Sequence, residues 1–496
     1  MKLAQHQRHF KLLNTLSLFF VLFGIFIRLI QYIDNRSLWA DEASLALNII
    51  NRSYGELLQP LDHNQAAPPG FLWVEKLATQ LLGDSEYALR LFPFVCGLVS
   101  LVAFYYLARR YAAPIAAPIA IALFASLRYT IYYTTEVKQY SSDVMIAILL
   151  SLLLLPPRRP HKLLLAVSGS VAIWFSHPAV FVLGGLETST LLSAPPKQRW
   201  SLLVERSPVY LAWLLNFALM YFLTISGTLN NETLVDSWAL RYPESIFDIV
   251  WLLDSLGRFF HRPLGFEAIA DGVAAFAFIL GCIALFKKNR SLLLALTAPI
   301  GATVVASYLH KYPFRDRLVL FLAPFAILIV AEGVSWLLQR HTQRWLMSIL
   351  GLVILAVLLF PPLTRATQLA IRPERVAEVR AAIEYVQSRQ QPGDTFYVYY
   401  GSMNQFLYYA PKYGYQDGDY ILGIHEIPEE GEAAGKKWQK YQKEIDNLRG
   451  QERVWLLFRG KEPEEEALLP YLNRIGRPLD SFKQPGVFVY LYDLRE

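Results

Sequence analysis

Long runs of apolar residues recur through the first 364 residues, and they restrict the possible folds of this chain more than any other feature. A helix needs about 17–25 mostly apolar residues to cross a bilayer, and its backbone must be hydrogen-bonded internally there. The sequence therefore predicts a polytopic α-helical membrane protein with about eleven transmembrane helices. We expect them near residues 12–33, 87–108, 112–130, 141–156, 162–177, 178–194, 207–226, 267–286, 291–309, 317–338 and 344–362.

Charged residues are sparse before residue 365 and common after it. They make up 18% of the whole chain, against about 25% in an average soluble protein. Residues 365–496 hold 38 charged side chains in 132 positions, which is a soluble composition, whereas the preceding 364 residues hold 50. The sequence thus predicts a transmembrane domain over 1–364 and a C-terminal soluble domain over 365–496.

The loops between the expected spans alternate between short basic ones and longer ones of mixed charge. Because basic loops stay in the cytoplasm, we expect a multi-pass protein of the cytoplasmic (inner) membrane with a cytoplasmic N-terminus and an extracytoplasmic soluble domain. The first span is too long for the core of a signal peptide, so we expect it to remain as an anchor. The basic loops contain Lys2, Arg8 and Lys11; Arg109 and Arg110; Arg158, Arg159 and Lys162; Lys197, Arg199 and Arg206; Lys287, Lys288 and Arg290; and Arg340 and Arg344.

The soluble domain alternates helical and strand-like segments. Residues 395–400, 420–424, 453–458 and 487–494 are rich in β-branched and aromatic residues. Helical patterns occupy 374–390, 404–413, 435–448 and 462–475, so we expect an α/β domain with a mostly parallel sheet. It contains no glycine-rich dinucleotide motif and the whole chain has no Walker A motif, so nothing supports binding of a soluble nucleotide.

Two further compositional features exclude other classes of protein. Cys96 and Cys282 are the only cysteines and lie in apolar runs, which excludes a disulfide scaffold and a structural zinc cluster. The net charge of +6 is too small to indicate a nucleic-acid partner.

The first outer loop, residues 34–86, is long enough to be functional, and Asp41 and Glu42 stand near its start. Adjacent carboxylates on a helix point about 100° apart, so both cannot easily address one atom. We expect one to be the working group and the other a partner or a cap. The alternative is that both simply favour a helix N-terminus.

The second outer turn places Glu136, Lys138, Tyr140 and Asp143 between two spans. Charged groups at such depth are costly and tend to be functional. The alternative is an anchoring belt of interfacial tyrosines and snorkelling charges. His177, alone in an outer turn, is a weaker candidate for a pocket residue.

A cationic turn precedes the expected span at 317–338. It contains Lys311, Arg315 and Arg317 with one acidic residue, Asp316. Arginine offers a planar fork of donors to phosphate oxygens. The alternative is attraction to bulk lipid headgroups, but positive charge on the outer side is disfavoured. This turn is therefore a candidate phosphate site.

The motif order is similar to that of the GT-C membrane glycosyltransferases, specifically glycosyltransferase family 39, which includes protein O-mannosyltransferases and lipid A aminoarabinose transferases. The resemblance covers about residues 10–340. It is carried by LWADEASLALNI, NQAAPPGFLWVEKLATQLLGDSEYALRLFP, EVKQYSSDV, FSHPAVF and YPFRDRLVLFLAP.

The resemblance implies roles for the candidate residues. Asp41, with Glu42 beside it, matches the acidic residue of the first outer loop that acts as the catalytic or acceptor-orienting group. Glu136 matches a second acidic site. Lys138 stands where many members have arginine, so Arg315 and Arg317 are the better candidates for a donor phosphate clamp. The soluble domain resembles the outward domains of some members, and no obligatory metal is implied.

The expected activity is therefore inverting transfer of a hexosyl or pentosyl group from a polyprenyl phosphate donor to a glycan, lipid or protein acceptor. An extracytoplasmic enzyme meets its donor on a lipid, because nucleotide sugars are not expected outside. Asp41 is the expected base, and it should share one cavity with Arg315 and Arg317. No cofactor is required. No His or Cys has a ligand-spaced neighbour, although a divalent ion shared by Asp41 and Glu136 stays open.

Two other functions stay open. A transporter or lipid flippase would predict inverted repeats and charges near the bilayer midplane, but the sequence has no repeat and its notable charges lie at span ends. A non-catalytic scaffold, with the soluble domain binding a partner, is the third possibility. The identities of the sugar and of the acceptor do not follow from the sequence.

Overall fold

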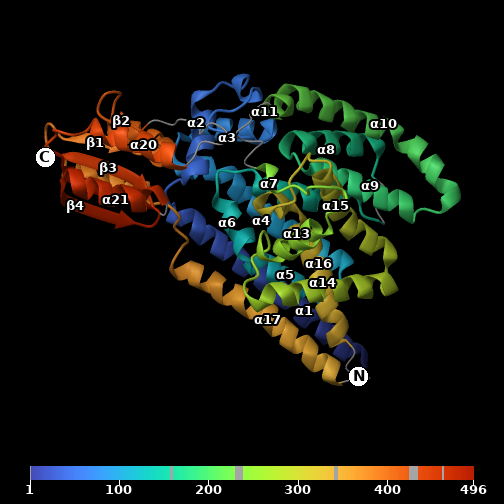
Figure 1. Cartoon of the computed structure of the whole chain (residues 1–496). Helices are drawn as coiled ribbons and strands as arrows, with labels where there is room; N and C mark the ends of the chain where they lie inside the picture. Colours follow the sequence, from blue (N-terminus) through green and yellow to red (C-terminus); the bar gives the residue numbers. More distant parts are fainter. Residues whose placement is uncertain are drawn as a thin grey trace. The chain divides into compact units, whose positions relative to one another are not determined.

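The computed structural model describes residues 2–156, 160–229, 238–339, 345–423, 434–460 and 463–495 (Figure 1). Arg158, Arg159, Arg340 and Arg344, which belong to the predicted basic loops, lie outside these residues. The chain forms two compact units. The first contains Met1–Asp34 and Arg52–Pro373, and the second contains Asn35–Asn51 and Glu374–Glu496. The segment 35–51 thus groups with the C-terminal residues, which the change of composition at residue 365 did not predict.

The first unit is helical, and every predicted span overlaps one of its helices. By length and composition, seven helical segments of the described residues can cross a membrane. They belong to α1 (Lys2–Asp34), α4 (Glu86–Tyr111), α10 (Pro196–Met220), α14 (Ile269–Lys288), α15 (Arg290–Tyr308), α16 (Ala323–Leu338) with the preceding turn η4 (Asp316–Leu322), and α17 (Trp345–Ile371). The predicted polytopic helical fold is confirmed.

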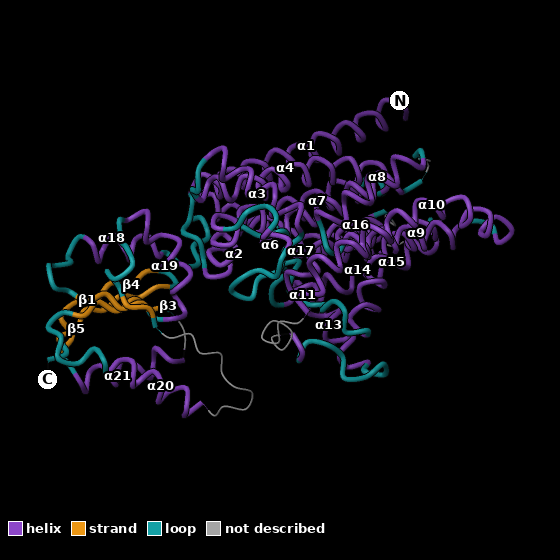
Figure 2. Tube along the Cα trace, turned by 90° about the horizontal axis from the view of Figure 1, so that it is seen from above, coloured by secondary structure: helices purple, strands orange, loops and turns teal. Residues whose placement is uncertain are grey.

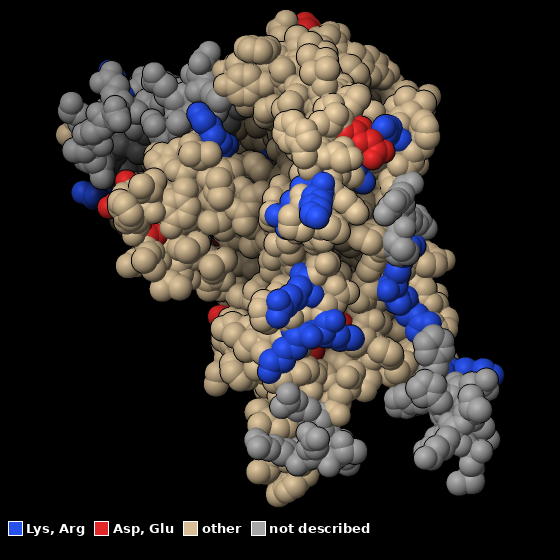
Figure 3. All heavy atoms as spheres, turned by 90° about the vertical axis from the view of Figure 1, so that its right-hand side faces the viewer, with Lys and Arg blue, Asp and Glu red and all other residues tan. Residues whose placement is uncertain are grey.

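Four other apolar helices are shorter or bent. These are α5 (Ala116–Ser126), α8 (Lys162–Phe175), α9 (Ala179–Ser193) and α7 (Tyr140–Leu154). Helix α7 follows α6 (Arg128–Tyr132) and η2 (Tyr133–Thr135) with a bend of 115°. The predicted span 112–130 is therefore interrupted, because α5 ends at Ser126 and Leu127 is extended. Figure 3 shows one face of the molecule on which uncharged residues predominate, as membrane contact requires.

Helix α5 lies in the core of this unit, and charged side chains from other helices form hydrogen bonds at its C-terminal end and in the turn before it. All of its residues are buried. At its C-terminal end the Arg28 guanidinium donates to the carbonyls of Phe124 and Ala125, each at 3.1 Å. In the turn before α5 the Glu332 carboxylate accepts from the backbone N–H of Ala113 at 2.5 Å. Buried charges here complete helix hydrogen bonding that the bilayer cannot supply.

Small residues allow α14 and α16 to pack closely. A Cβ atom at Gly281 would lie 1.8 Å from the carbonyl oxygen of Ile329, and one at Gly333 would lie 2.0 Å from that of Ala277. Such close backbone approach through small residues is typical of membrane helix pairs.

The remaining helices of the first unit belong to its predicted outer loops. They are η1 (Glu56–Leu58), α3 (Pro69–Leu82), α11 (Ser226–Leu229) and α13 (Ile249–His261). Helix α13 is capped by Asp248, whose side chain accepts from the N–H of Trp251 at 2.8 Å.

The second unit is a five-stranded α/β domain with α2 (Ala40–Asn51) added to it. Its strands have the order β2-β1-β3-β5-β4, and β2, β1 and β3 are parallel while β5 is antiparallel to both neighbours. Figure 2 shows α18 and α19 on one side of the sheet and α20 and α21 on the other. Its elements are α18 (Val379–Gln387), β1 (Thr395–Val398), η5 (Tyr400–Ser402), α19 (Met403–Tyr409), η6 (Ala410–Tyr413), β2 (Ile421–Leu422), α20 (Ala434–Asp446), β3 (Val454–Arg459), α21 (Pro463–Ile475), β4 (Arg477–Gln484) and β5 (Val487–Asp493).

The sequence analysis did not predict β4. Its residues RPLDSFKQ are mostly polar because it is an edge strand, exposed along most of its length. It joins β5 through Gly486, whose φ of 69° suits a glycine in a tight turn. The sheet is therefore parallel on one side and a β-hairpin on the other.

Candidate functional site

Asp41 and Glu42 occupy the first turn of α2, in the second unit. The Glu42 carboxylate accepts a hydrogen bond of 3.3 Å from the backbone N–H of Trp39, which immediately precedes the helix. This is the reciprocal half of a capping box, in which an acidic side chain satisfies the N–H at the start of the helix. Glu42 is fully buried, whereas Asp41 is partly exposed. The two adjacent carboxylates therefore have different surroundings.

The turn before α7, in the first unit, holds the second group of predicted residues. Glu136 is extended and fully buried. The Lys138 ammonium donates a short hydrogen bond to the side-chain oxygen of Gln65, in the predicted first outer loop. Tyr140 begins α7 and contacts Tyr133 edge to face, with ring centroids 5.0 Å apart. This hydrogen bond connects the turn before α7 to residues of the predicted first outer loop that belong to the first unit.

A cavity of about 280 Å³ lies beside this turn. Three arginines line it, and its other walls are mainly aromatic. The Arg317 guanidinium also lies 5.7 Å from the ring centroid of Tyr140, which places it next to the turn that carries Glu136 and Lys138. The cavity is lined by Tyr129, Tyr133, Trp238, Arg241, Arg262, Pro263, Asp316 and Arg317.

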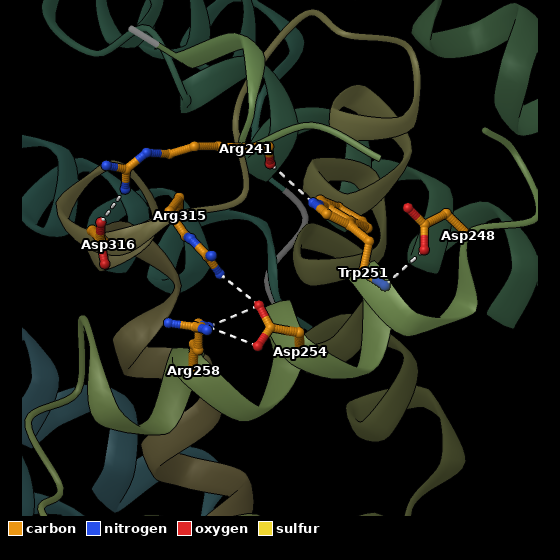
Figure 4. Close-up of polar contacts among 7 residues, drawn as sticks. All are labelled: Arg241, Asp248, Trp251, Asp254, Arg258, Arg315 and Asp316. Carbon is orange, nitrogen blue, oxygen red and sulfur yellow. Dashed lines mark hydrogen bonds and ion pairs between the residues drawn. The ribbon is translucent and has the colours of Figure 1, made fainter. Parts of the chain in front are cut away.

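Two arginines of the cavity are held in place by neighbouring side chains. Arg262 donates to the hydroxyl of Tyr129 at 2.6 Å. Arg241 pairs with Asp316 at 2.9 Å, as Figure 4 shows. With one carboxylate against three guanidinium groups, the cavity keeps an excess of positive charge, which suits an anion.

Arg315 points to a different partner. Its guanidinium forms an ion pair of 3.1 Å with Asp254 of α13, and Arg258 binds the same carboxylate (Figure 4). Partial burial alone would raise the pKa of Asp254, but the hydrogen bonds from Arg258 and Arg315 bring it below its ordinary value. Arg315 therefore ties the turn between α15 and α16 to α13, whereas Arg317 lines the cavity.

The remaining predicted residues also belong to the first unit. Asp143 is buried in the first turn of α7, and His177 is half-buried in the turn between α8 and α9. Among the described residues, no group of three His, Cys, Asp or Glu side chains is placed to hold a metal ion.

Three residues with notable geometry were not predicted. Arg241 and Arg262 stand singly in the outer loop at 227–266, where their only sequence signal is positive charge on a side that the positive-inside rule disfavours. Glu75 is the third, an acidic residue on the apolar helix α3. Both of its oxygens are buried, with no hydrogen-bond partner in the part of the chain that the structure describes, and this burial raises its pKa well above the ordinary value.

The family model described as dolichyl-phosphate-mannose-protein mannosyltransferase matches residues 66–225, which include the turn with Glu136 and Lys138. No curated protein sequence matches the chain.

The fold is similar to two crystal structures of ArnT from Cupriavidus metallidurans. The apo structure has a TM-score of 0.53 at 13% identity and covers 95% of this chain and 97% of that chain. The structure bound to undecaprenyl phosphate has a TM-score of 0.52 at 12% identity and covers 96% and 97%. The chain thus has the fold of ArnT, and over residues 66–225 the matching family model agrees with the glycosyltransferase resemblance predicted from its sequence.

Proposed function

We propose that this protein is a membrane glycosyltransferase that moves a sugar from a polyprenyl phosphate donor to an acceptor on the extracytoplasmic face, with inversion. The matching family model is named for a mannosyltransferase that uses a lipid phosphate sugar. One of the structures with a similar fold contains undecaprenyl phosphate. Both favour a lipid-linked donor for this chain as well.

The observation that carries the proposal is the cavity with Arg241, Arg262 and Arg317 in its walls. A sugar attached to a lipid phosphate leaves its donor when the bond from the anomeric carbon to the phosphate oxygen breaks. Negative charge then accumulates on the departing phosphate, and fixed positive charge lowers the barrier most when it is already in place. Guanidinium groups supply that charge together with directed N–H donors. The aromatic walls suit the sugar faces and the start of the lipid chain.

Asp41 is the proposed base. Its carboxylate polarises or takes the proton of the acceptor hydroxyl as that oxygen attacks the anomeric carbon. One carboxylate suffices for direct displacement, and direct displacement inverts the anomeric centre. A retaining reaction would require a second carboxylate as nucleophile. The capping contact of Glu42 supports a role in holding the helix that carries Asp41.

The other predicted residues receive supporting roles. Glu136 supports Asp41 or binds the acceptor, and Lys138 adds positive charge beside the donor through its fixed position on Gln65. Tyr140 orients Arg317, with which it is in contact. Asp143 and His177 are proposed to complete the pocket. We retain the assignment of residues 1–364 to the catalytic transmembrane domain and of 365–496 to an extracytoplasmic domain.

The test is a transfer assay with the purified full-length protein in lipid nanodiscs. Radiolabelled polyprenyl phosphate sugars are offered with glycan, lipid and peptide acceptors, and the anomeric configuration of the product is determined by NMR. Transfer with inversion is expected for the wild type and should be strongly reduced in Arg317→Ala and Arg262→Ala. Arg290→Ala is a matched control, because Arg290 lies at the start of α15 and does not line the cavity. Movement of the donor across the bilayer without transfer would overturn the proposal in favour of a flippase.

A further inference from the structure

The helix with the proposed base, α2, is part of the C-terminal unit although it lies in the first outer loop. Residues 35–51 group with residues 374–496 in one compact unit, while the residues on either side of this segment belong to the membrane unit. The contacts that hold α2 come from α19, from the loop before α18 and from α18 itself.

Leu38, two residues before the start of α2, is fixed through both of its backbone groups. The N–H of Leu38 donates to the hydroxyl of Tyr409 at 2.8 Å. The carbonyl of Leu38 accepts from the side-chain amide of Gln405 at 3.1 Å. Leu38, Gln405 and Tyr409 are all buried, so these bonds are shielded from water. Together they fix the direction in which the chain enters α2.

A second contact reaches the first turn of α2. The amide of Asn404 donates to the hydroxyl of Ser44 at 2.8 Å. That hydroxyl in turn donates to the carbonyl of Ala40 at 2.8 Å. Ala40 directly precedes Asp41, so this chain of hydrogen bonds runs from α19 to the turn that carries the proposed base.

A third contact holds the start of the segment. The guanidinium of Arg380, in α18, donates to the hydroxyl of Ser37 at 3.3 Å and makes a short bond to the carbonyl of Asn35. Ser37 also donates to the carboxylate of Glu378 at 3.4 Å. The segment is thus bound to the C-terminal unit along its extended part as well as along its helix.

The sheet explains why α19 can act as a fixed support. Helix α19 follows the carboxyl end of β1 after one short turn. Phe406 packs edge to face on Phe396 of β1, with ring centroids 5.2 Å apart. Asn404 and Gln405 precede Phe406 directly, so their amides are positioned by the core of the domain. Sites supported by regular elements are held more accurately than sites on loops.

We propose that the C-terminal unit positions the catalytic helix, and that Asn404, Gln405 and Tyr409 are positioning residues for Asp41. This inference rests on the proposed function, because it assumes that Asp41 acts as the base. Their hydrogen bonds set the orientation of the first turn of α2 and hence the angle of the Asp41 carboxylate toward the acceptor hydroxyl. The domain therefore contributes to the chemical step rather than to binding of the lipid donor.

The test compares three variants with a matched control in the full-length protein. Tyr409→Phe removes only the hydroxyl that accepts from Leu38, and Gln405→Glu removes the amide donor with little change of size. Asn404→Ala removes the bond to Ser44. Tyr492→Phe is the control, because it removes a tyrosine hydroxyl that bonds Asn473 at 2.8 Å in the same unit.

The readouts are kcat, the KM for the lipid donor, and hydrogen–deuterium exchange of residues 35–51. A small misplacement of a catalytic group can lower the rate by about 100-fold. We expect kcat to fall by about 10- to 100-fold in the three variants, with an unchanged donor KM and faster exchange over 38–46. Tyr492→Phe should match the wild type in all three readouts. Unchanged kcat in the variants would overturn the positioning role, whether or not exchange rises.

Failure of the proposed function would look different. In that case the wild type would transfer no sugar, or Asp41→Asn would be as active as the wild type. An active wild type, an inactive Asp41→Asn and fully active positioning variants would reject only the present inference.

Discussion

The backbone N–H of Trp39 donates a hydrogen bond of 3.3 Å to the carboxylate of Glu42. This contact gives Glu42 a capping role, and the sequence alone does not reveal which of the two acidic neighbours, Asp41 or Glu42, has it. Asp41→Asn should abolish sugar transfer while the protein stays folded, because an amide cannot accept the proton. Glu42→Gln should keep most of the activity, because its amide oxygen still accepts from Trp39. Transfer assays and thermal unfolding of both variants check this prediction.

Glu42→Ala is the complementary change. It removes the cap, which should cost about 0.3–1.5 kcal/mol of stability, and should lower activity only as far as α2 loosens. An inactive Glu42→Gln with unchanged unfolding temperature would assign the catalytic role to Glu42 instead.

The two arginines of the RDR segment should differ in their effect on donor use. Arg317 lines the cavity, so Arg317→Ala should lower kcat/KM for the lipid donor by about 1.5–3 kcal/mol, the range for a hydrogen bond to a charged group. Arg315 instead pairs with Asp254 at 3.1 Å. Arg315→Ala should cost stability of about 0–1 kcal/mol, as for other partly exposed pairs. Steady-state kinetics with varied donor concentration distinguish the two roles. An equal loss of kcat/KM in both variants would mean that both arginines bind the donor phosphate, as the sequence predicts.

Glu75 should make the stability of the protein fall as the pH rises. Burial raises its pKa well above the ordinary value, so the folded state keeps this proton at a pH where the unfolded state has lost it. The contribution of Glu75 to the free energy of unfolding is therefore greatest below its pKa in the unfolded chain, about 4.3. It declines as the pH rises toward the pKa of Glu75 in the folded protein. Glu75→Gln should remove this dependence and raise the unfolding temperature at about pH 8 more than at about pH 5.

The control for Glu75 is Glu205→Gln, which removes an exposed carboxylate paired with Lys162 at 3.4 Å. It should leave the pH dependence of unfolding as in the wild type. If Glu75→Gln changed the unfolding temperature by the same amount at every pH, the role assigned to burial of Glu75 would be contradicted.

Arg28 should be important for stability but not for chemistry. Its guanidinium satisfies the carbonyls of Phe124 and Ala125, and also that of Thr130 at 2.8 Å. Arg28→Met leaves these buried acceptors without their donor, at a cost of about 1–3 kcal/mol or more. Arg28→Lys keeps the charge with a single donor group and should be intermediate. Thermal unfolding in detergent measures the order, and a wild-type unfolding temperature for Arg28→Met would refute it.

The sequence was sufficient for the membrane fold because the thickness of the bilayer sets the length of each apolar run. In the predicted span 112–130, apolar length alone did not predict a break in the helix. Its apolar length is adequate, but the chain leaves the helix at Leu127 and turns before α7. At the break between α5 and α6, Arg28 donates to carbonyls of both helices, and a contact so distant in sequence leaves no local pattern.

The sequence suggested only part of the candidate site. Because charge is rare at span ends, Asp41, Lys138 and Arg317 are candidates from the sequence alone, and their roles stay predictions. Arg241 and Arg262 are single arginines in a long loop, and only the folded chain brings them to the same cavity as Arg317. The contact of Asn404 with Ser44 is likewise invisible in the sequence, since 360 positions separate the two residues.

The grouping of residues 35–51 with the C-terminal unit has a consequence for engineering and for comparison of homologues. The polypeptide passes between the two units at residues 34–35, at 51–52 and again at 373–374. A chimera that exchanges only residues 374–496 would pack α2 of one parent against the C-terminal residues of the other. Functional hybrids should therefore require both segments from the same parent, and substitutions in α19 should be matched by compensating ones near residues 37–44.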